Sequence, residues 1–264
     1  VSFDATPSGV SIGRWPNATG KLYPQASQTL GSANSGPRIG PVVISEVMYN
    51  PAGGNDDLEY IELYNITAAA VDIGGWRFDA GVTFTLPTGT ILGPHATLTL
   101  VHFDPVAAIN AGKLATFRST YGISNLVPLA GPYAGTLSNG GENVRLVRPD
   151  TPPPGEPNFI PLVLVDEVDY QDLAPWPLSA DGLGKSLTRL GWGNYGDDPA
   201  NWIGATGTPG SVPALVAARQ IFYNGSSFDL SDSAAGAADD GAIASGKSPL
   251  LPGGAATVAN YTNY

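Results

Sequence analysis

The feature that most constrains the fold of this chain is a pair of apolar runs joined by a turn, at residues 42–65. The first run, residues 42–48, leads into a turn rich in Pro, Gly, Asn and Asp, and the second, residues 58–64, alternates with period two. Successive side chains of a strand point to opposite faces. The two runs therefore predict a β-hairpin-like pair with acidic residues on one face and aliphatic residues on the other.

The composition extends this pattern to the whole chain. The 264 residues include 34 Gly and 24 Pro, with short runs of Val, Ile, Leu and Thr between them, which is typical of many short strands and tight turns. We therefore expect an all-β protein with one short helix within residues 105–122. Strands are expected near residues 42–49, 58–64, 70–78, 82–86, 97–102, 143–148, 162–170 and 185–190.

Charge and composition exclude several classes of partner. The net charge of −11 opposes contact with nucleic-acid phosphates, and the absence of cysteine removes disulfides and thiol chemistry. No run approaches the roughly 18 apolar residues of a membrane helix, so no membrane insertion is expected. The chain begins at Val1 with no signal peptide, and we expect it to be an internal fragment of a longer protein.

Three motifs together resemble the bacterial lamin-tail domain family. They are I-S-E-V-M-Y-N-P at residues 44–51, E-Y-I-E-L-Y-N at residues 59–65 and G-G-W at residues 74–76. The resemblance covers roughly residues 41–213 and is specific in its first 25 residues. It implies an immunoglobulin-like β-sandwich embedded in a large secreted or surface protein. It implies no reaction, because the family is defined by its architecture.

The segment that closes such a domain has an echo near the start of the chain. The pattern G-x-S-x-x-R stands at residues 184–189, followed by T-x-G-S at residues 208–211, and both patterns recur at residues 9–14 and 29–32. Self-similarity of this kind indicates an array of units, and chance similarity in a Ser/Gly/Thr-rich chain is the alternative. We therefore predict three parts. Residues 1–40 are the closing segment of a preceding module plus a linker, residues 41–213 are the lamin-tail-like sandwich, and residues 214–264 begin a second small β module.

The strand pattern also predicts one two-sheet core. Its expected members are Ile44, Val47, Ile61, Leu63, Trp76, Leu98, Leu100, Val144, Leu146, Val163, Val165, Leu187 and Trp202.

Common catalytic patterns fail on inspection, and we expect no catalytic residues and no enzyme. Gly184-Lys185-Ser186 suggests a phosphate loop, but Ser179 stands where that motif needs its first glycine. The two histidines, His95 and His102, lack the spacing of a zinc site, and no G-x-S-x-G sequence marks a hydrolase nucleophile.

Acidic residues in the first turn are the candidate metal ligands. Asp56, Asp57 and Glu59 lie close together, and carboxylates that converge with backbone carbonyls suit calcium. Further acids stand at Asp197 and Asp198 and in the last 40 residues. The alternative is that these are ordinary solvated turn acids, since none follows the EF-hand pattern. Apart from calcium, no cofactor is expected.

Two of the five tryptophans are the candidate ligand contacts. Trp176 is flanked by prolines and Trp192 by glycines, so both are expected in loops. Exposed aromatic rings in loops can contact a glycan or protein ligand.

The sequence therefore predicts a non-catalytic structural or adhesive module of a long bacterial extracellular or cell-surface protein, with assembly into fibres through neighbouring copies or modules. The alternative is a glycan- or protein-binding module, calcium-dependent and accessory to a secreted hydrolase. Residues 1–32 and 214–264 are expected to expose unpaired strand edges, which pair readily with another chain. Sequence alone does not identify a ligand, an organism, the other domains of the parent protein or an oligomeric state.

Overall fold

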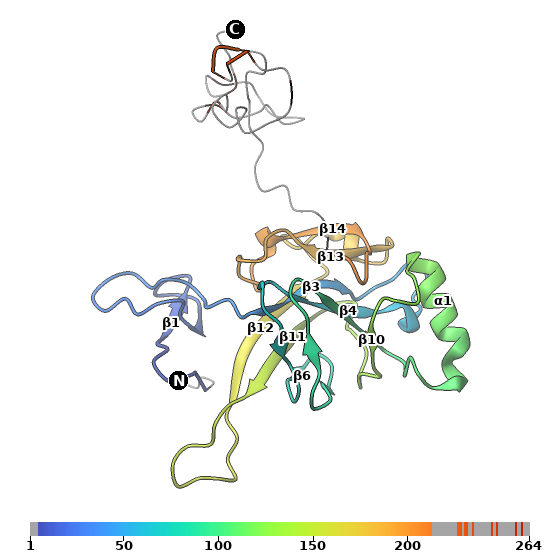
Figure 1. Ribbon diagram of the computed structural model, residues 1–264, viewed down its shortest axis with the longest axis horizontal. Helices are drawn as coiled ribbons and strands as arrows, with labels where there is room; N and C mark the ends of the chain where they lie inside the picture. The colour runs from blue at the N-terminus through green and yellow to red at the C-terminus, as the bar shows by residue number, and fades with distance from the viewer. Residues whose placement is uncertain are drawn as a thin grey trace. The chain divides into compact units, whose positions relative to one another are not determined.

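The computed structural model describes residues 5–212, and after them residues 226–228, 230, 231, 234, 244, 247, 257 and 260 (Figure 1). The chain divides into two compact units, Val1–Pro213 and Ala214–Tyr264. The small β module predicted at residues 214–264, with its open strand edge, falls almost wholly outside the described residues.

The described part is built from short strands, as the sequence predicts. The elements are β1 (Ile12–Trp15), β2 (Lys21–Pro24), β3 (Val42–Met48), η1 (Asp56–Leu58), β4 (Tyr60–Asn65), β5 (Val71–Asp72), β6 (Arg77–Ala80), β7 (Phe84–Thr85), β8 (Ile91–Leu92), β9 (Thr97–Val101), η2 (Ala108–Asn110), α1 (Ala111–Tyr121), β10 (Leu129–Ala130), β11 (Gly141–Pro149), β12 (Leu162–Gln171), η3 (Leu178–Ala180), β13 (Lys185–Arg189), η4 (Pro199–Asn201) and β14 (Trp202–Thr206).

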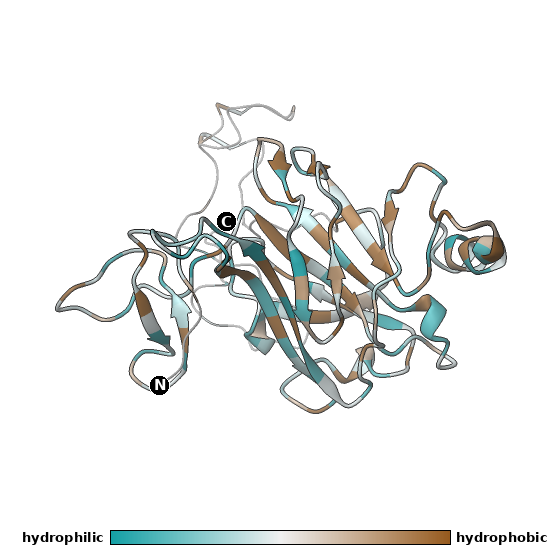
Figure 2. Cartoon of the chain, turned by 90° about the horizontal axis from the view of Figure 1, so that it is seen from below, coloured by the Kyte–Doolittle hydropathy of each residue, from teal (hydrophilic) through white to brown (hydrophobic). Residues whose placement is uncertain are grey.

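Two sheets form a sandwich. One has six strands in the order β10-β9-β4-β3-β13-β14, and the other has four in the order β12-β11-β6-β7. Strands β5 and β8 form a small separate ribbon, as do β1 and β2. Hydrophobic and hydrophilic residues alternate along the sandwich strands in Figure 2, as expected where one face of a strand meets the core. The predicted all-β sandwich is confirmed.

A β-bulge in β3 sets which residues face the core. Ile44 pairs with Leu63 and Val47 pairs with Ile61, so Ser45 is the extra residue between them. A bulge shifts the alternation of side chains by one position. Ile44 and Val47, three residues apart, therefore enter the same core.

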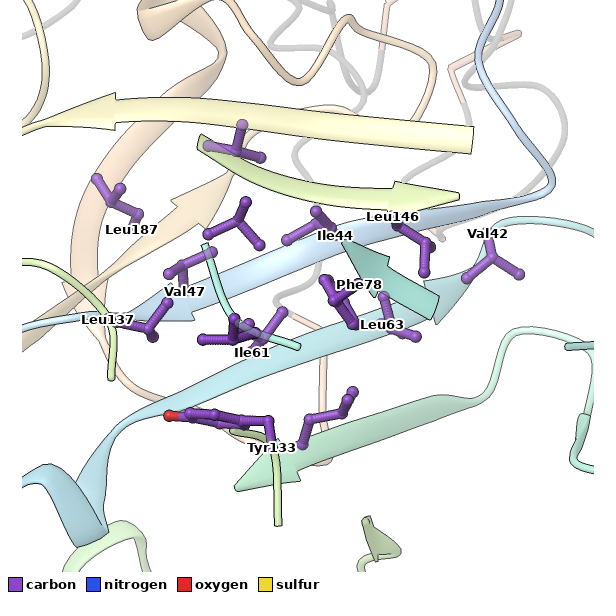
Figure 3. Close-up of a cluster of buried hydrophobic side chains, with 14 of the residues drawn as sticks. Val42, Ile44, Val47, Ile61, Leu63, Phe78, Tyr133, Leu137, Leu146 and Leu187 are labelled. Atoms are coloured by element: carbon purple, nitrogen blue, oxygen red, sulfur yellow. The ribbon is translucent and has the colours of Figure 1, made fainter. Parts of the chain in front are cut away.

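The core lies between the two sheets. Figure 3 shows Ile44, Val47, Ile61 and Leu63 of β3 and β4 gathered with Phe78 and Leu146 of the opposite sheet. All thirteen residues predicted for the core are buried, and all except Val163 belong to this one cluster. Val163 instead bridges to Ala5 near the start of the chain.

The outer face of the six-stranded sheet is also covered. Met48, Tyr60 and Val101 form a second buried cluster with Phe103 and with Phe117 of α1. The helix falls within the range expected from the sequence and ends at Gly122, whose φ of +65° is the left-handed conformation that glycine adopts most readily. In the described part of the chain, no helix has the length and apolar character to cross a membrane.

Residues 5–38, which we call the N-terminal arm, pack against the chain's own sandwich. Its strands β1 and β2 form an antiparallel hairpin. Lys21 Nζ contacts the carboxylates of Asp169 at 2.7 Å and Asp197 at 2.9 Å, and the Tyr23 hydroxyl donates to Asp197 at 2.9 Å. The arm therefore packs on this sandwich through polar side chains that find partners on β12 and on the loop after β13, while its assignment to a preceding module stays a prediction.

Trp202 fills the core and offers a direct test of the sandwich. Trp202 is 3% exposed and packs in the main cluster, so Trp202→Ala should lower the free energy of unfolding by about 3–5 kcal/mol, the usual range for a buried aromatic residue. Urea denaturation followed by circular dichroism measures this loss. Leu126→Ala is the matched control, because Leu126 is 92% exposed and its truncation should change stability by less than about 0.5 kcal/mol. Equal effects of the two variants would contradict the assigned core.

Candidate functional site

The two glutamates of the hairpin motif form a buried pair. Glu46 of β3 lies directly opposite Glu62 of β4, and each is only 1% exposed. They stand on the sheet face that also carries Met48 and Tyr60, away from the main core. No sequence pattern predicts that these two acids are buried together.

The acidic residues of the hairpin do not share one face, contrary to the prediction. Glu59 and Glu62 are three positions apart on one strand run, so period two places them on opposite sides of the sheet. Glu59 lies on the side of Ile61 and Leu63. Glu62 lies on the side of Glu46, where the bulge at Ser45 brings Glu46 opposite to it.

The buried pair accepts hydrogen bonds from residues 186 and 208–210, which follow most of the sandwich in the sequence. Glu46 accepts a hydrogen bond from the Ser186 hydroxyl. It also accepts from the backbone N–H of Thr208, which lies 3.1 Å from Oε1 and 3.2 Å from Oε2 of Glu46. Glu62 accepts from the Ser45 hydroxyl at 2.8 Å and from the backbone N–H of Gly210 at 2.6 Å. The T-x-G-S turn at residues 208–211 is thus fastened by its own backbone donors. We call this arrangement the glutamate clasp.

Burial changes the ionisation of the clasp. Desolvation raises the pKa of Glu62 to about 8, and the neighbouring Glu46 carboxylate adds to the rise. Desolvation also raises the pKa of Glu46, against the opposing effect of its hydrogen bonds from Ser186 and Thr208. Raised carboxyl pKa values often mark general acids. Here the carboxyl groups are closed off from solvent and occupied by internal donors, which favours a structural role.

A second buried charge joins the two sheets. Asp166 of β12 accepts hydrogen bonds from the Arg189 guanidinium of β13 and from the backbone N–H of Ile44, the latter at 2.8 Å. Arg189 also donates to the Ile44 carbonyl at 3.1 Å, and its side chain is fully buried. This arginine is the R of the closing G-x-S-x-x-R pattern. The motif thus supplies Ser186 to the glutamate clasp and Arg189 to the ion pair.

The predicted metal ligands are not gathered into a site. Glu59 is buried and accepts from the Tyr133 hydroxyl at 3.2 Å and the Leu137 N–H at 3.0 Å, while desolvation raises its pKa to about 7. Asp57 pairs instead with Lys113 of α1 at 2.8 Å. Across the described residues, no group of three or more His, Asp or Glu is placed to hold a metal ion. Asp56, Asp57 and Glu59 therefore diverge, because the side chain of Glu59, just before β4, reaches Tyr133 and Leu137 in the core while Asp57 pairs with Lys113.

The two tryptophans predicted to contact a ligand differ in their exposure to solvent. Trp176 is 5% exposed and packs against Trp202, with ring centroids 6.4 Å apart, so the prediction of an exposed contact is wrong for this residue. Its flanking prolines shape a loop that folds inward. Trp192 is half-buried against Tyr64, with ring centroids 4.9 Å apart, and stays a predicted contact.

A family model described as the Lamin Tail Domain matches residues 36–153, a range that contains both glutamates of the clasp. Residues 36–153 belong to the lamin tail domain family. The predicted family is thereby confirmed. Strands β12, β13 and β14 lie beyond the matched residues and complete the two sheets of the sandwich.

Other comparisons add little. No curated protein matched the chain. Among solved structures, a DUF4876 family protein from Bacteroides thetaiotaomicron is similar, with 12% identity, a TM-score of 0.39, and coverage of 68% of this chain and 73% of that one. A likeness at this level carries no argument about function.

The lamin tail domain is an immunoglobulin-like domain and is generally non-enzymatic.

The clasp predicts that stability falls as pH rises. The folded protein holds a proton on Glu62 up to about pH 8, whereas an unfolded glutamate with the ordinary pKa of 4.5 has already lost it. Between these values the folded state binds more protons, so the free energy of unfolding decreases with pH, by at most about 1.4 kcal/mol per pH unit for each such proton. Urea titrations from pH 4.5 to 9 measure the slope.

Glu62→Gln should reduce that slope, because glutamine cannot titrate. Glu156→Gln is the matched control, since Glu156 is exposed in a loop and its replacement should leave the slope unchanged. An identical slope in wild type and Glu62→Gln would rule out the raised pKa of Glu62.

The buried ion pair predicts a strongly asymmetric mutational response. Arg189→Met leaves the Asp166 carboxylate buried without its partner and should cost about 3–5 kcal/mol in urea unfolding. The double variant Arg189→Met/Asp166→Leu should be more stable than Arg189→Met alone, because it removes the uncompensated charge. For comparison, Lys113→Met breaks an exposed pair with Asp57 and should cost no more than about 1 kcal/mol. A double variant less stable than Arg189→Met would contradict this account.

Proposed function

We propose that this chain is a non-catalytic structural or adhesive module of a long bacterial extracellular or cell-surface protein. The lamin tail domain supports a structural role, since the family is immunoglobulin-like and generally non-enzymatic. The use of the buried acids supports it further. Glu46, Glu59, Glu62 and Asp166 each accept hydrogen bonds from other parts of the fold, which leaves them committed to holding the sandwich together.

The observation that carries the proposal is the repeated closing hairpin. Strands β13 and β14 pair antiparallel with Arg189 opposite Trp202, and β1 and β2 pair antiparallel with Arg14 opposite Leu22. Each hairpin is followed by a T-x-G-S sequence. In this proposal β1–β2 is the closing hairpin of a preceding module, and it contacts the outside of the sandwich through Lys21 and Tyr23. In an array of such modules, the closing hairpin of one module lies against the next.

Electron microscopy of the native material tests the proposed role. Gold-labelled antibodies against the sandwich should decorate structures outside the cell, at a regular spacing if the modules form an array. A broad hydrolase screen on the purified protein should give no turnover. Label confined to the cell interior, or turnover that one Asp or Glu substitution abolishes, would contradict the proposal.

Assembly of neighbouring copies into fibres is a further part of the proposal and has a test of its own. Because head-to-tail contacts generate open filaments unless the rotation closes a ring, light scattering of the full chain should show species that grow with concentration. A monomer at all concentrations, with the N-terminal arm seated on its own sandwich, would leave the chain as a spacer without self-assembly.

Docking of the arm can be tested by charge reversal. Lys21→Glu replaces the attraction to Asp169 and Asp197 with repulsion. The loss of two partly exposed ion pairs should lower the free energy of arm release by roughly 1 kcal/mol. The population of molecules with a released arm should then rise about fivefold. Limited proteolysis should therefore cut within residues 25–40 about fivefold faster, with little change in the melting temperature of the sandwich. Lys113→Glu, which reverses a comparable pair on α1, should not alter cleavage in the arm. Unchanged cleavage in Lys21→Glu would show that these contacts do not hold the arm.

A further inference from the structure

A cleft of about 380 Å³ lies where the N-terminal arm meets the sandwich. The hairpin β1–β2 supplies one wall and the loop between β13 and β14 supplies the other. Its volume falls within the range of roughly 300–1,000 Å³ that is typical of small-molecule sites. The residues that line it are Trp15, Pro16, Gly20, Lys21, Tyr23, Tyr195, Asp197, Asp198 and Pro199.

Aromatic rings form both walls of this cleft. Tyr23 of the arm and Tyr195 of the loop meet edge to face, with ring centroids 4.8 Å apart and an angle of 67° between planes. Trp15 lies on the arm side, and the far edge of its indole packs over Gly36, where an added Cβ would come within 3.6 Å of the ring. Trp15 and Tyr195 are both only half-buried. Their rings combine a fixed position with access to solvent, which suits contact with a flat apolar surface.

The polar groups of the cleft carry both signs of charge. Lys21 contributes an ammonium donor held between Asp169 and Asp197. Asp197 accepts from Lys21, Tyr23 and the Asp169 N–H, whereas Asp198 is exposed and uses one oxygen to accept from the Ala200 N–H at 3.0 Å. An ion of either sign would meet a like charge here. A neutral ligand rich in hydroxyl groups would meet both donors and acceptors.

We propose that this cleft binds a neutral oligosaccharide. The apolar faces of the sugar rings lie against Trp15 and Tyr195, and the hydroxyl groups donate to Asp198 and accept from Lys21. The site is complete only while the arm is docked, because Trp15 and Lys21 come from the arm and Tyr195 and Asp198 come from the loop. Binding therefore stabilises the docked arm, since a ligand favours the form that it binds.

This inference is independent of the array proposed above. A chain that forms no array keeps the cleft, because arm and loop belong to the same unit. Failure of one proposal leaves the other intact.

The test is calorimetric and NMR titration of the full chain with fragments of cellulose, xylan, mannan and chitin, together with an acidic oligogalacturonate and a cationic chitosan oligomer. At least one neutral fragment should bind and should slow proteolytic cleavage of the arm. Trp15→Ala should weaken that binding about tenfold through loss of the aromatic contact. Because Trp15→Ala can also loosen the hairpin, Asp198→Asn is the second variant. Asparagine caps a helical turn as well as aspartate does, so the loop should keep its shape while binding weakens.

Phe159→Ala is the matched control, because Phe159 is an exposed aromatic residue of the loop between β11 and β12, outside the cleft. It should leave the affinity unchanged. The proposal is overturned if no neutral fragment binds with a Kd of 10 mM or tighter, which corresponds to roughly 2.7 kcal/mol of binding free energy. It is overturned as well if only the charged oligomers bind. It is also overturned if Phe159→Ala weakens binding while Trp15→Ala and Asp198→Asn do not.

Discussion

The closing of the sandwich depends on carboxylates that are buried where carboxylates are normally avoided. Glu46 and Glu62 sit side by side away from solvent, at a cost that only hydrogen bonding and protonation can offset. Their partners come from more than 120 positions further along the chain, at Ser186, Thr208 and Gly210. Hence the first hairpin and the last segment stabilise each other. The buried glutamates gain their long-range donors only when residues 186 and 208–210 are in place, and the backbone N–H groups of Thr208 and Gly210 find their acceptors on these glutamates.

Much of the fold follows from the sequence because strand alternation is a local property. The run around Ile61 and Leu63 shows its core face by period two, and the predicted core residues Ile44, Leu146 and Leu187 are buried as expected. Strand β14 was missed although its Trp202 was placed in the core, since its pattern is short and follows a proline turn. The distribution of acids over the two faces was predicted wrongly, because Glu59 and Glu62 are an odd number of positions apart and lie on opposite sides of the sheet. The bulge at Ser45, which the pattern does not reveal, brings Glu46 onto the side of Glu62.

The candidate sites were harder to predict because they depend on contacts between distant segments. Asp56 and Asp57 lie in the short helix of the turn, but the side chain of Glu59, just before β4, is buried against Tyr133 and Leu137. The close spacing of the three residues in the sequence does not reveal this difference. The prolines beside Trp176 predict an exposed loop, yet the Trp176 ring packs against Trp202 in the core. The clasp residues were present in the motifs that identified the family. What the sequence could not show was that the I-S-E and E-L-Y-N motifs bind the T-x-G-S motif directly.

The bulge at Ser45 also bears on how this family can vary. Deleting Ser45 would restore simple alternation and leave Glu46 opposite Glu62, because Ser45 is the one residue of this stretch without a partner on β4. The deletion would remove the hydroxyl that donates to Glu62 at 2.8 Å, whereas the exposed loop at residues 155–160 can lengthen or shorten without the loss of such a contact. An alignment of relatives would then show both glutamates kept even where the residue between Ile44 and Glu46 is missing.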